Sequence, residues 1–257
     1  MATDSEPVIL MYHSIAEGDS PLQVPPPLFA QQMEWLHTNA RVLPLAEMVT
    51  ALVGKQTLPE RAVVLTFDDG FADFAAHAAP VLLRLGFPAT VFLPTQYCGG
   101  SNNWPGQPAW VKPEPLLSWA EVRRLAADGI GFGAHTRSHC RLSEIPVAVA
   151  KEEIRLSQED IATHAGIAAD FFCYPYGMWN RQVRDLVALS YKGACSTMAA
   201  PVSSGADPFA LPRVDAHYLR RTSLFRSLFT PRFRAYVWAR RMVRHVRGQS
   251  EGAYAGQ

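Results

Sequence analysis

The sequence is poor in cysteine, lacks long apolar runs and has almost no net charge. Four cysteines occur in 257 residues, and no C-x-x-C pair is present. This pattern argues against a zinc ribbon and a dense disulfide framework. No apolar run approaches the roughly 20 residues that a membrane-spanning helix needs. The N-terminus carries Asp4 and Glu6 where a signal peptide has Lys or Arg. We therefore predict a cytoplasmic protein, with membrane association as an alternative.

The net charge of +1 hides two regions of opposite sign. Residues 213–257 contain 10 arginines against Asp215 and Glu251, which gives a charge of +8. Residues 1–212 carry the remainder, −7. The hydrophobic fraction of 48% is large enough for a sizeable core. The length fits one large domain with a basic tail.

Strand-like apolar runs alternate with amphipathic helical segments, about seven times along the chain. This alternation predicts parallel strands with helical crossovers, in a barrel or an open doubly wound sheet. The expected strands are 7–12, 41–43, 63–67, 88–93, 130–134, 170–173, 193–197 and 209–214. The expected helices are 28–39, 45–53, 73–85, 118–128, 146–165 and 180–190.

Polar side chains follow several of these strands directly. Asp68 and Asp69 end the strand 63–67, and His135 and His139 follow the strand 130–134. In a barrel of parallel strands, chemistry gathers at the C-terminal ends of the strands. An Asp-Gly turn and ordinary hydrogen-bonded histidines remain the simpler alternatives.

Two imidazoles and one carboxylate form a three-ligand metal site with positions left for water and substrate. The neighbouring carboxylate is then free to act as a base beside the metal. This arrangement suits hydrolysis of an amide or ester. The same ligand types also hold Fe(II) in oxygenases, but the adjacent free Asp68 favours hydrolysis.

Three ordered motifs give the chain a family resemblance. They are Thr66–Gly70, His135–His139 and Tyr174–Gly177, and Leu10–Ile15 opens the chain in a similar way. They resemble the motifs of the polysaccharide deacetylase family (NodB-homology domain, carbohydrate esterase family 4), of the type found in exopolysaccharide systems. The resemblance implies a distorted (β/α)7-8 barrel. We expect it to fill residues 1–217, followed by a basic helical extension over residues 218–257.

The resemblance also implies roles for individual residues. Asp68 resembles the catalytic base, and the ligands of a divalent metal correspond to Asp69, His135 and His139. Zn²⁺ is the default, and Co²⁺, Ni²⁺ and Mn²⁺ fit similar ligands. The backbone N–H of Tyr176 would join the oxyanion hole, with Pro175 beside it.

The chain also departs from the family pattern. The third motif usually begins with an Arg that pairs with the base, but Cys173 holds that position. Arg213 is our candidate for the missing charge, and a surface or capping Arg is the alternative. His217 is the candidate proton donor to the leaving amine. His13, at a strand end, is expected to line the pocket.

The basic tail predicts one further helix. Thr230 and Pro231 are a good helix start. An apolar stripe follows at helical spacing, made of Ala235, Trp238, Ala239, Met242 and Val246. Such a helix, over residues 231–247, can lie on an anionic membrane or pack against the acidic body. Nucleic acid is not an expected partner, since no recognition motif accompanies the arginines.

The combined prediction is a metal-dependent hydrolase acting on carbon–nitrogen bonds other than peptide bonds. It would remove N-acetyl, and in some relatives O-acetyl, groups from a polysaccharide or oligosaccharide, in making or modifying an exopolysaccharide. One alternative keeps the site and changes the substrate to a small-molecule amide or cyclic ureide. Another is an inactive carbohydrate-binding barrel, for which Cys173 is the main support.

Overall fold

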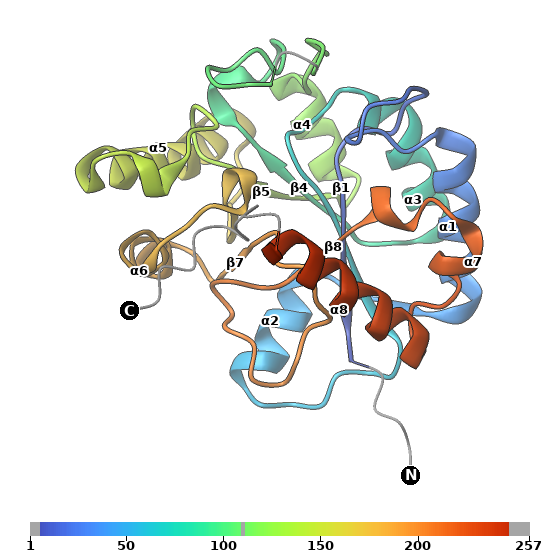
Figure 1. Cartoon of the computed structure of the whole chain (residues 1–257). Coiled ribbons are helices and arrows are strands. Elements are labelled where there is room, and N and C mark those ends of the chain that lie inside the picture. The colour runs from blue at the N-terminus through green and yellow to red at the C-terminus, as the bar shows by residue number, and fades with distance from the viewer. Residues whose placement is uncertain (1–5, 109–110, 247–257) are drawn as a thin grey trace.

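The structure, a computed structural model, describes residues 6–108 and 111–246, with side chains as far as residue 242. Its centre is a curled sheet with every strand pair parallel, and helices surround it (Figure 1). The strand order is β7-β6-β5-β4-β3-β1-β8, and β2 pairs with β3. The strands are β1 (Val8–Tyr12), β2 (Arg41–Val42), β3 (Ala62–Phe67), β4 (Thr90–Leu93), β5 (Gly131–Ala134), β6 (Phe171–Cys173), β7 (Gly193–Cys195) and β8 (Val214–Asp215).

The predicted distorted barrel is confirmed as a curled, partly closed sheet. β7 and β8 end the strand order, and the segment before β8 joins them. Leu211 forms an isolated parallel bridge with Cys195 and donates its N–H to the Ala194 carbonyl over 2.9 Å. The predicted strand 209–214 is therefore reduced to this bridge and the short β8. Pro212 contributes no N–H to a longer ladder.

The helices follow the predicted alternation. They are α1 (Pro26–Asn39), α2 (Leu45–Val53), α3 (Ala79–Leu85), α4 (Trp119–Ala127), α5 (Val147–Ala165), α6 (Arg181–Ser190), α7 (Thr222–Phe225) and α8 (Pro231–Val246). The predicted helix 73–85 is divided, because a π-helical turn, Phe74–Ala78, precedes α3. Ala79 donates its N–H to Phe74, five residues back, and the next residue, Pro80, has no N–H to donate.

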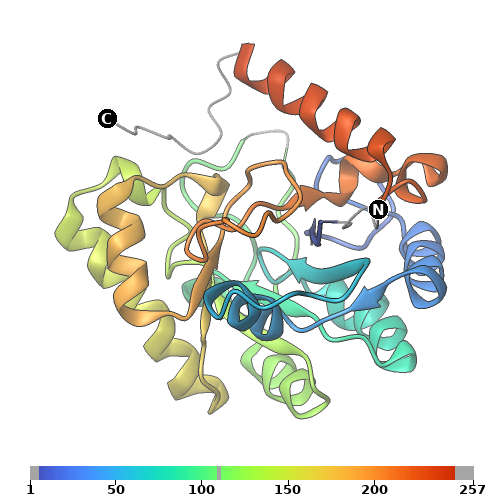
Figure 2. The ribbon, with the colours of Figure 1, turned by 90° about the horizontal axis from the view of Figure 1, so that it is seen from below.

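Strand alternation creates two apolar cores. Val8 and Leu10 of β1 face the outer helices, and Ile9 faces the interior of the curled sheet. The inner core also receives Met48 and Val49 of α2. Seen from below, α2 lies in front of the strands while other helices surround them (Figure 2). Helix α2 therefore closes the end of the barrel opposite the C-terminal ends of the strands.

The same alternation sets the direction of Asp68. Val64 belongs to the inner core, and Thr66 and Asp68 follow at intervals of two residues. The Thr66 hydroxyl donates to the Leu10 carbonyl over 2.8 Å and is fully buried. Asp68 thus lies at the top of the barrel interior, where only a polar partner can compensate its charge.

The segment after residue 217 packs on the body. Phe225, Phe233 and Val237 belong to the outer core, and Trp35 of α1 contacts Phe225 with the ring centroids 5.7 Å apart. The division of the chain at residue 217 stays a prediction. None of the helices in the described part of the chain is long and apolar enough to cross a membrane.

Gly133 provides a test of the barrel interior. A Cβ at this position would lie 2.6 Å from the Phe171 carbonyl oxygen and 2.6 Å from the Phe92 ring. We expect Gly133→Ala to lower the free energy of unfolding by about 1–3 kcal/mol, measured by urea denaturation. Gly205→Ala is the matched control, because nothing lies within 4 Å of its added Cβ. Equal stability of the two variants would contradict this packing.

Candidate active site

Three predicted metal ligands come together at the C-terminal ends of β3 and β5. The Nε2 atoms of His135 and His139 lie 3.4 and 3.2 Å from the same Asp69 oxygen, Oδ1. All three side chains are buried, and their ligand atoms lie within 4.8 Å of one another. Sequence spacing alone could not show this convergence, because Asp69 and His135 are 66 positions apart in the chain.

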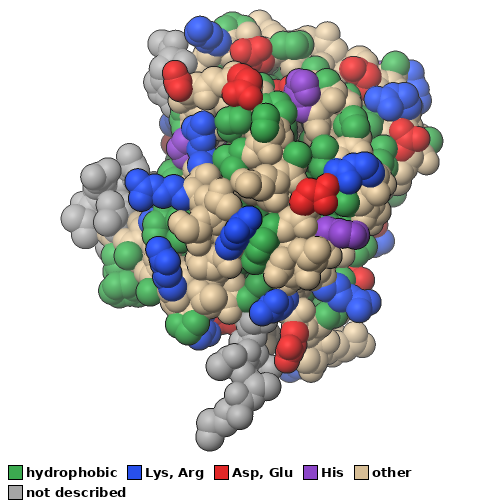
Figure 3. Space-filling model, turned by 90° about the vertical axis from the view of Figure 1, so that its right-hand side faces the viewer, with side chains coloured by type: hydrophobic (Ala, Val, Ile, Leu, Met, Phe, Trp, Pro, Cys, Tyr) green, Lys and Arg blue, Asp and Glu red, His purple; other side chains and the backbone are tan. Residues whose placement is uncertain are grey.

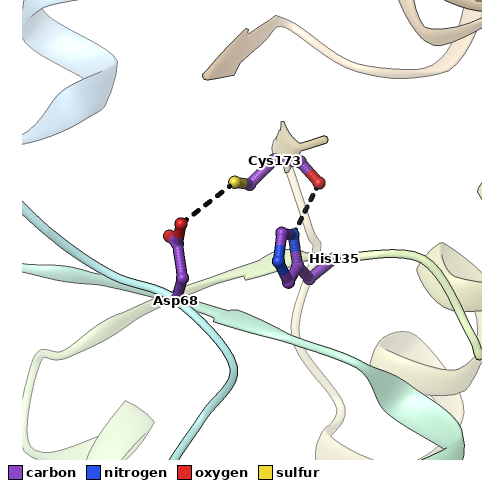
Figure 4. Close-up of side chains that lie close together, drawn as sticks. All are labelled: Asp68, His135 and Cys173. Atoms are coloured by element: carbon purple, nitrogen blue, oxygen red, sulfur yellow. Dashed lines mark hydrogen bonds between the residues drawn. The ribbon is translucent and has the colours of Figure 1, made fainter. Parts of the chain in front are cut away.

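Neighbouring groups orient the two imidazoles. His135 Nδ1 lies 2.7 Å from the Cys173 carbonyl oxygen (Figure 4). A proton on Nδ1 leaves the Nε2 lone pair directed at the Asp69 cluster. The His139 ring stacks at a tilt on Trp104, with the centroids 4.0 Å apart, and its Nδ1 has no hydrogen-bond partner among the described residues. The loop between β4 and α4 therefore places Trp104 against a predicted ligand, whereas Trp110 of the same loop lies outside the described residues.

Left-handed backbone conformations accompany the site. Asp69, Thr136, His139 and Tyr176 have φ values of 69°, 62°, 57° and 60°. Non-glycine residues seldom adopt this region, and such residues cluster at functional sites. At Asp69 the reversal of φ allows two adjacent carboxylates to serve different partners.

Arg213 is the partner of Asp68. Its Nη1 and Nη2 donate to the two Asp68 carboxylate oxygens over 2.7 and 2.6 Å. Nε donates to the Ser196 carbonyl over 2.9 Å, and Nη1 also reaches the Thr66 hydroxyl over 3.1 Å. Arg213 is the largest fully buried side chain of the described residues. The structure therefore pairs Asp68 with a cation from the segment before β8.

Cys173 completes this cluster as a neutral group. Its thiol lies 3.5 Å from Asp68 Oδ2 and accepts a hydrogen bond from Arg213 Nη2 over 3.0 Å. Figure 4 shows it between Asp68 and His135. Burial raises the pKa of the Cys173 thiol to about 11, so the thiol is protonated at neutral pH.

The two carboxylates are held in their charged forms. Burial would raise the pKa of Asp68, but the charge and hydrogen bonds of Arg213 outweigh it and lower this pKa. Burial acts in the same direction on Asp69, and His139 and His135 together bring its pKa well below the usual range. Burial lowers the pKa of His139, which favours a neutral ring with a lone pair.

Carboxylates of α5 fix the histidine loop. Glu153 Oε2 accepts the N–H groups of Arg137 and Ser138 over 2.9 and 2.8 Å, and its Oε1 accepts the Ser138 hydroxyl. Asp160, two helical turns away, accepts from Thr95 and Arg137. The sequence reasoning missed both residues. The available signal was their spacing of seven residues, which places both carboxylates on one face of the helix.

The remaining predicted residues lie around this centre. Tyr176 and Pro175 form a short 3-10 turn after β6, and the Tyr176 ring packs edge-on against His139 with the centroids 4.8 Å apart. His13 is close enough to Asp68 and Asp69 to favour their charged forms. His217 follows β8, and its backbone N–H donates to the Asp215 carboxylate over 2.9 Å.

The state of His217 bears on its predicted role. Burial lowers its pKa, and the partly opposing effect of Asp215 does not reverse this. The ring is therefore neutral near pH 7 in the free protein. Its Nδ1 has no hydrogen-bond partner in the part of the chain that the structure describes. Its role as a proton donor stays a prediction.

The donor set fits a divalent metal. Two imidazole nitrogens and one ionised carboxylate oxygen converge in a buried site, the ligand types of a catalytic zinc centre. A second group of possible ligands, Asp68, His135 and Cys173, is also close together. It fits less well, because Arg213 occupies both oxygens of Asp68 and the thiol is protonated.

Comparison with known proteins agrees with this geometry. A family model described as Polysaccharide deacetylase matches residues 55–192, more than half of the chain. The chain belongs to the polysaccharide deacetylase family. It is 28% identical over 208 residues to YxkH of Bacillus subtilis (strain 168), which carries the polysaccharide deacetylase name provisionally. The match covers 80% of the chain and 70% of YxkH.

Relatives named for a specific polysaccharide are more distant. The Poly-beta-1,6-N-acetyl-D-glucosamine N-deacetylase of Escherichia coli (strain K12) is 27% identical over 223 residues, covering 72% of this chain. The chain spans only 32% of the length of that protein.

Two solved structures share the architecture. The Streptococcus pyogenes deacetylase PplD, in complex with acetate, aligns with a TM-score of 0.72 and 25% identity, over 83% of this chain and 93% of PplD. IcaB from Ammonifex degensii aligns with a TM-score of 0.71 and 24% identity, over 82% and 91% of the two chains, and shows the fold alone.

Glu153 gives a test of how the histidine loop is held. We expect Glu153→Ala to weaken zinc binding by about 10–100-fold, because the loop carrying His139 loses three hydrogen bonds. Titration calorimetry with ZnCl₂ measures the change. Glu152→Ala is the matched control, since Glu152 is exposed and pairs with Arg155. Equal zinc affinities of the Glu153→Ala and Glu152→Ala variants would show that Glu153 does not support the metal site.

Proposed function

We propose that the protein is a metal-dependent hydrolase that removes N-acetyl groups from a polysaccharide or oligosaccharide. The observation that carries the proposal is the pairing of two buried carboxylates with different partners. Asp69 faces two histidines, and the adjacent Asp68 is held ionised by Arg213. A binding barrel has no need of a second buried charge next to the ligand set, whereas hydrolysis needs a base there.

The metal would be held by Asp69, His135 and His139. When bound, a divalent ion such as Zn²⁺, or Co²⁺, Ni²⁺ or Mn²⁺ with similar ligands, polarises the acetyl carbonyl and makes a nearby water more acidic. The protein supplies the low-pKa carboxylate of Asp69, and burial favours the neutral form of the His139 ring, as such an ion requires.

Asp68 is the proposed base. It takes one proton from the attacking water as the water oxygen bonds to the acetyl carbon. Arg213 is a positioning residue that keeps both Asp68 oxygens in place and keeps the carboxylate ionised. Without this cation, burial would protonate Asp68 and remove its basicity.

Residues at three other strand ends, those of β6, β1 and β8, would complete the reaction. The Tyr176 N–H is the proposed donor to the oxyanion, with Pro175 holding the turn and His13 lining the pocket. Breaking the carbon–nitrogen bond releases acetate and a sugar amine, and the amine nitrogen must gain a proton. His217 is the proposed donor, and because its ring is neutral at rest it must first receive the proton that Asp68 has taken.

An exported polysaccharide is the proposed substrate. Relatives named for poly-beta-1,6-N-acetyl-D-glucosamine favour a polymer of N-acetylated sugars. The opening motif Leu10–Ile15, similar to that of exopolysaccharide systems, agrees with this. We propose N-deacetylation as the main activity, with action at the cytoplasmic side.

Release of acetate tests the proposal directly. We expect the zinc-loaded protein to release acetate from acetylated glycans, and Asp68→Asn to lower kcat by at least about 100-fold, because the amide cannot accept a proton. An enzyme-coupled acetate assay over a panel of glycans measures this. Treatment with a chelator should abolish activity, and added Zn²⁺ should restore it.

The same panel separates the alternatives. Small amides and cyclic ureides cleaved in preference to glycans would favour a small-molecule hydrolase. Glycan binding without acetate release, in protein that binds zinc, would favour an inactive carbohydrate-binding barrel. Activity that persists in metal-free protein would contradict the proposed mechanism.

The pH dependence of the rate tests whether Arg213 lowers the pKa of Asp68. In Arg213→Met the lowering effect on the pKa of Asp68 is lost and burial dominates, so this pKa rises. The base is then protonated over a wider range, and the acid limb of the kcat/KM profile moves to higher pH. A buried charge left unpaired also destabilises the fold, by about 3–5 kcal/mol.

A second substitution provides the control. Cys173 lies beside the same carboxylate, 3.0 Å from Arg213 Nη2. Adding Cys173→Arg to Arg213→Met returns a cation to Asp68, and we expect it to shift the acid limb back. An unshifted profile in a folded, zinc-binding Arg213→Met protein would show that Arg213 does not tune the base.

A further inference from the structure

Helix α8 has two apolar faces, and only one of them packs on the body. Phe233 and Val237 are buried on the inner face, and the Tyr236 hydroxyl donates to the Tyr218 carbonyl over 3.1 Å. These residues lie three or four positions apart, as one helix face requires. The residues of α8 that pack on the body are therefore different from the apolar stripe that the sequence pattern predicts.

That stripe faces solvent. The Trp238 side chain is 64% exposed and Met242 is 38% exposed, with Ala235 and Ala239 exposed between them. Val246 continues the spacing, but its side chain lies outside the described residues. Helix α8 does pack on the body, as one of the two alternatives expected, but through Phe233 and Val237 and not through this stripe. Trp238 and Met242, with the alanines between them, form an exposed apolar patch on a helix that already has a packed face, and such patches mark interaction sites.

Positive charge surrounds this stripe. Residues 216–250 contain nine arginines and no Asp or Glu. Arg232 and Arg234 are exposed on opposite flanks of the stripe, in the first turn of α8, where no acidic residue is present. Cations at a helix N-terminus oppose the helix dipole in water. In Figure 3, several Lys and Arg side chains and few acidic ones lie along the left half of the face.

We propose that the outer face of α8 binds the surface of an anionic lipid bilayer. Trp238 and Met242 would enter the boundary between headgroups and acyl chains, and the flanking arginines would contact lipid phosphates. Anionic headgroups would also offset the unfavourable charge at the helix N-terminus. A second copy of the chain suits this face poorly, since a symmetric contact would bring arginines against arginines.

Docking would place the catalytic centre close to the membrane. The inner side of α8 closes a cavity lined by Arg213, Asp215, Tyr218, Tyr236 and Arg240. The Arg240 guanidinium lies 3.4 Å from the centroid of the Tyr218 ring. The same helix thus presents one face to the lipid and the other to the segment that carries Arg213 and His217. A glycan held at the membrane surface would then be the accessible substrate.

Vesicle flotation of the full chain tests the proposal. We expect binding to vesicles containing about one-third phosphatidylglycerol, none to pure phosphatidylcholine, and release at about 0.5 M salt. Trp238→Ala should weaken binding about tenfold, and Arg232→Glu with Arg234→Glu should abolish it. Activity on a soluble acetylated oligosaccharide should be unchanged in these variants, which separates failure of the surface from failure of the proposed function.

Matched controls come from other surfaces. Leu189→Ala removes an apolar side chain that is 82% exposed on α6, and Lys151→Glu reverses an exposed charge on α5. Neither should alter flotation. Absence of wild-type binding, or binding by the Trp238→Ala and double Glu variants equal to the wild type, would overturn the proposal. A Trp238-dependent dimer in sedimentation without flotation would assign the face to a second copy instead.

Discussion

The buried pair of Asp68 and Arg213 is the interaction on which the site depends. Both partners lie at the top of the barrel interior, where an unpaired charge would be strongly disfavoured. The pair keeps a carboxylate ionised without solvent, which burial alone would prevent. It also joins the end of β3 to the segment that closes the barrel, so the same contact holds the fold closed and keeps the proposed base ionised.

The rest of the site is rigid for related reasons. Asp69 turns away from Asp68 through a left-handed backbone, and its carboxylate holds both imidazoles. The Cys173 carbonyl fixes one ring, and Glu153 of α5 fixes the loop that carries the other. Each predicted ligand is thus positioned by a group from a different element, which is the arrangement of a preformed metal site.

The sequence predicted the parallel alternation and most element boundaries. Apolar periodicity carries this information because burial acts locally along each element. It could not predict the π-helical turn before α3, which depends on the geometry around one proline. Nor could it give the short β8, because strand length at a closing edge depends on how far the sheet curls.

Long-range side-chain contacts were harder to predict than motifs. Arg213 became a candidate only because Cys173 stands where the family usually has an arginine. No local sequence pattern links residues 68 and 213. Glu153 and Asp160 carried a weak signal in their spacing. For α8 the sequence identified the apolar stripe but not whether it faces the body or solvent. Phe233 and Val237 form a second apolar face, and only this second face packs on the body.

The position of Arg213 has a consequence for how the protein is made. The stretch that matches the family model ends at residue 192, before this arginine. During synthesis the residues of β1 to β7 leave the ribosome before Arg213, so Asp68 is made before its counter-charge. The unfinished barrel has an open edge beside β1 until residues 211–215 emerge. Asp68 gains the cation that favours its ionised form only when the last strand is inserted, so a chain that ended before Arg213 would leave a buried carboxylate unpaired.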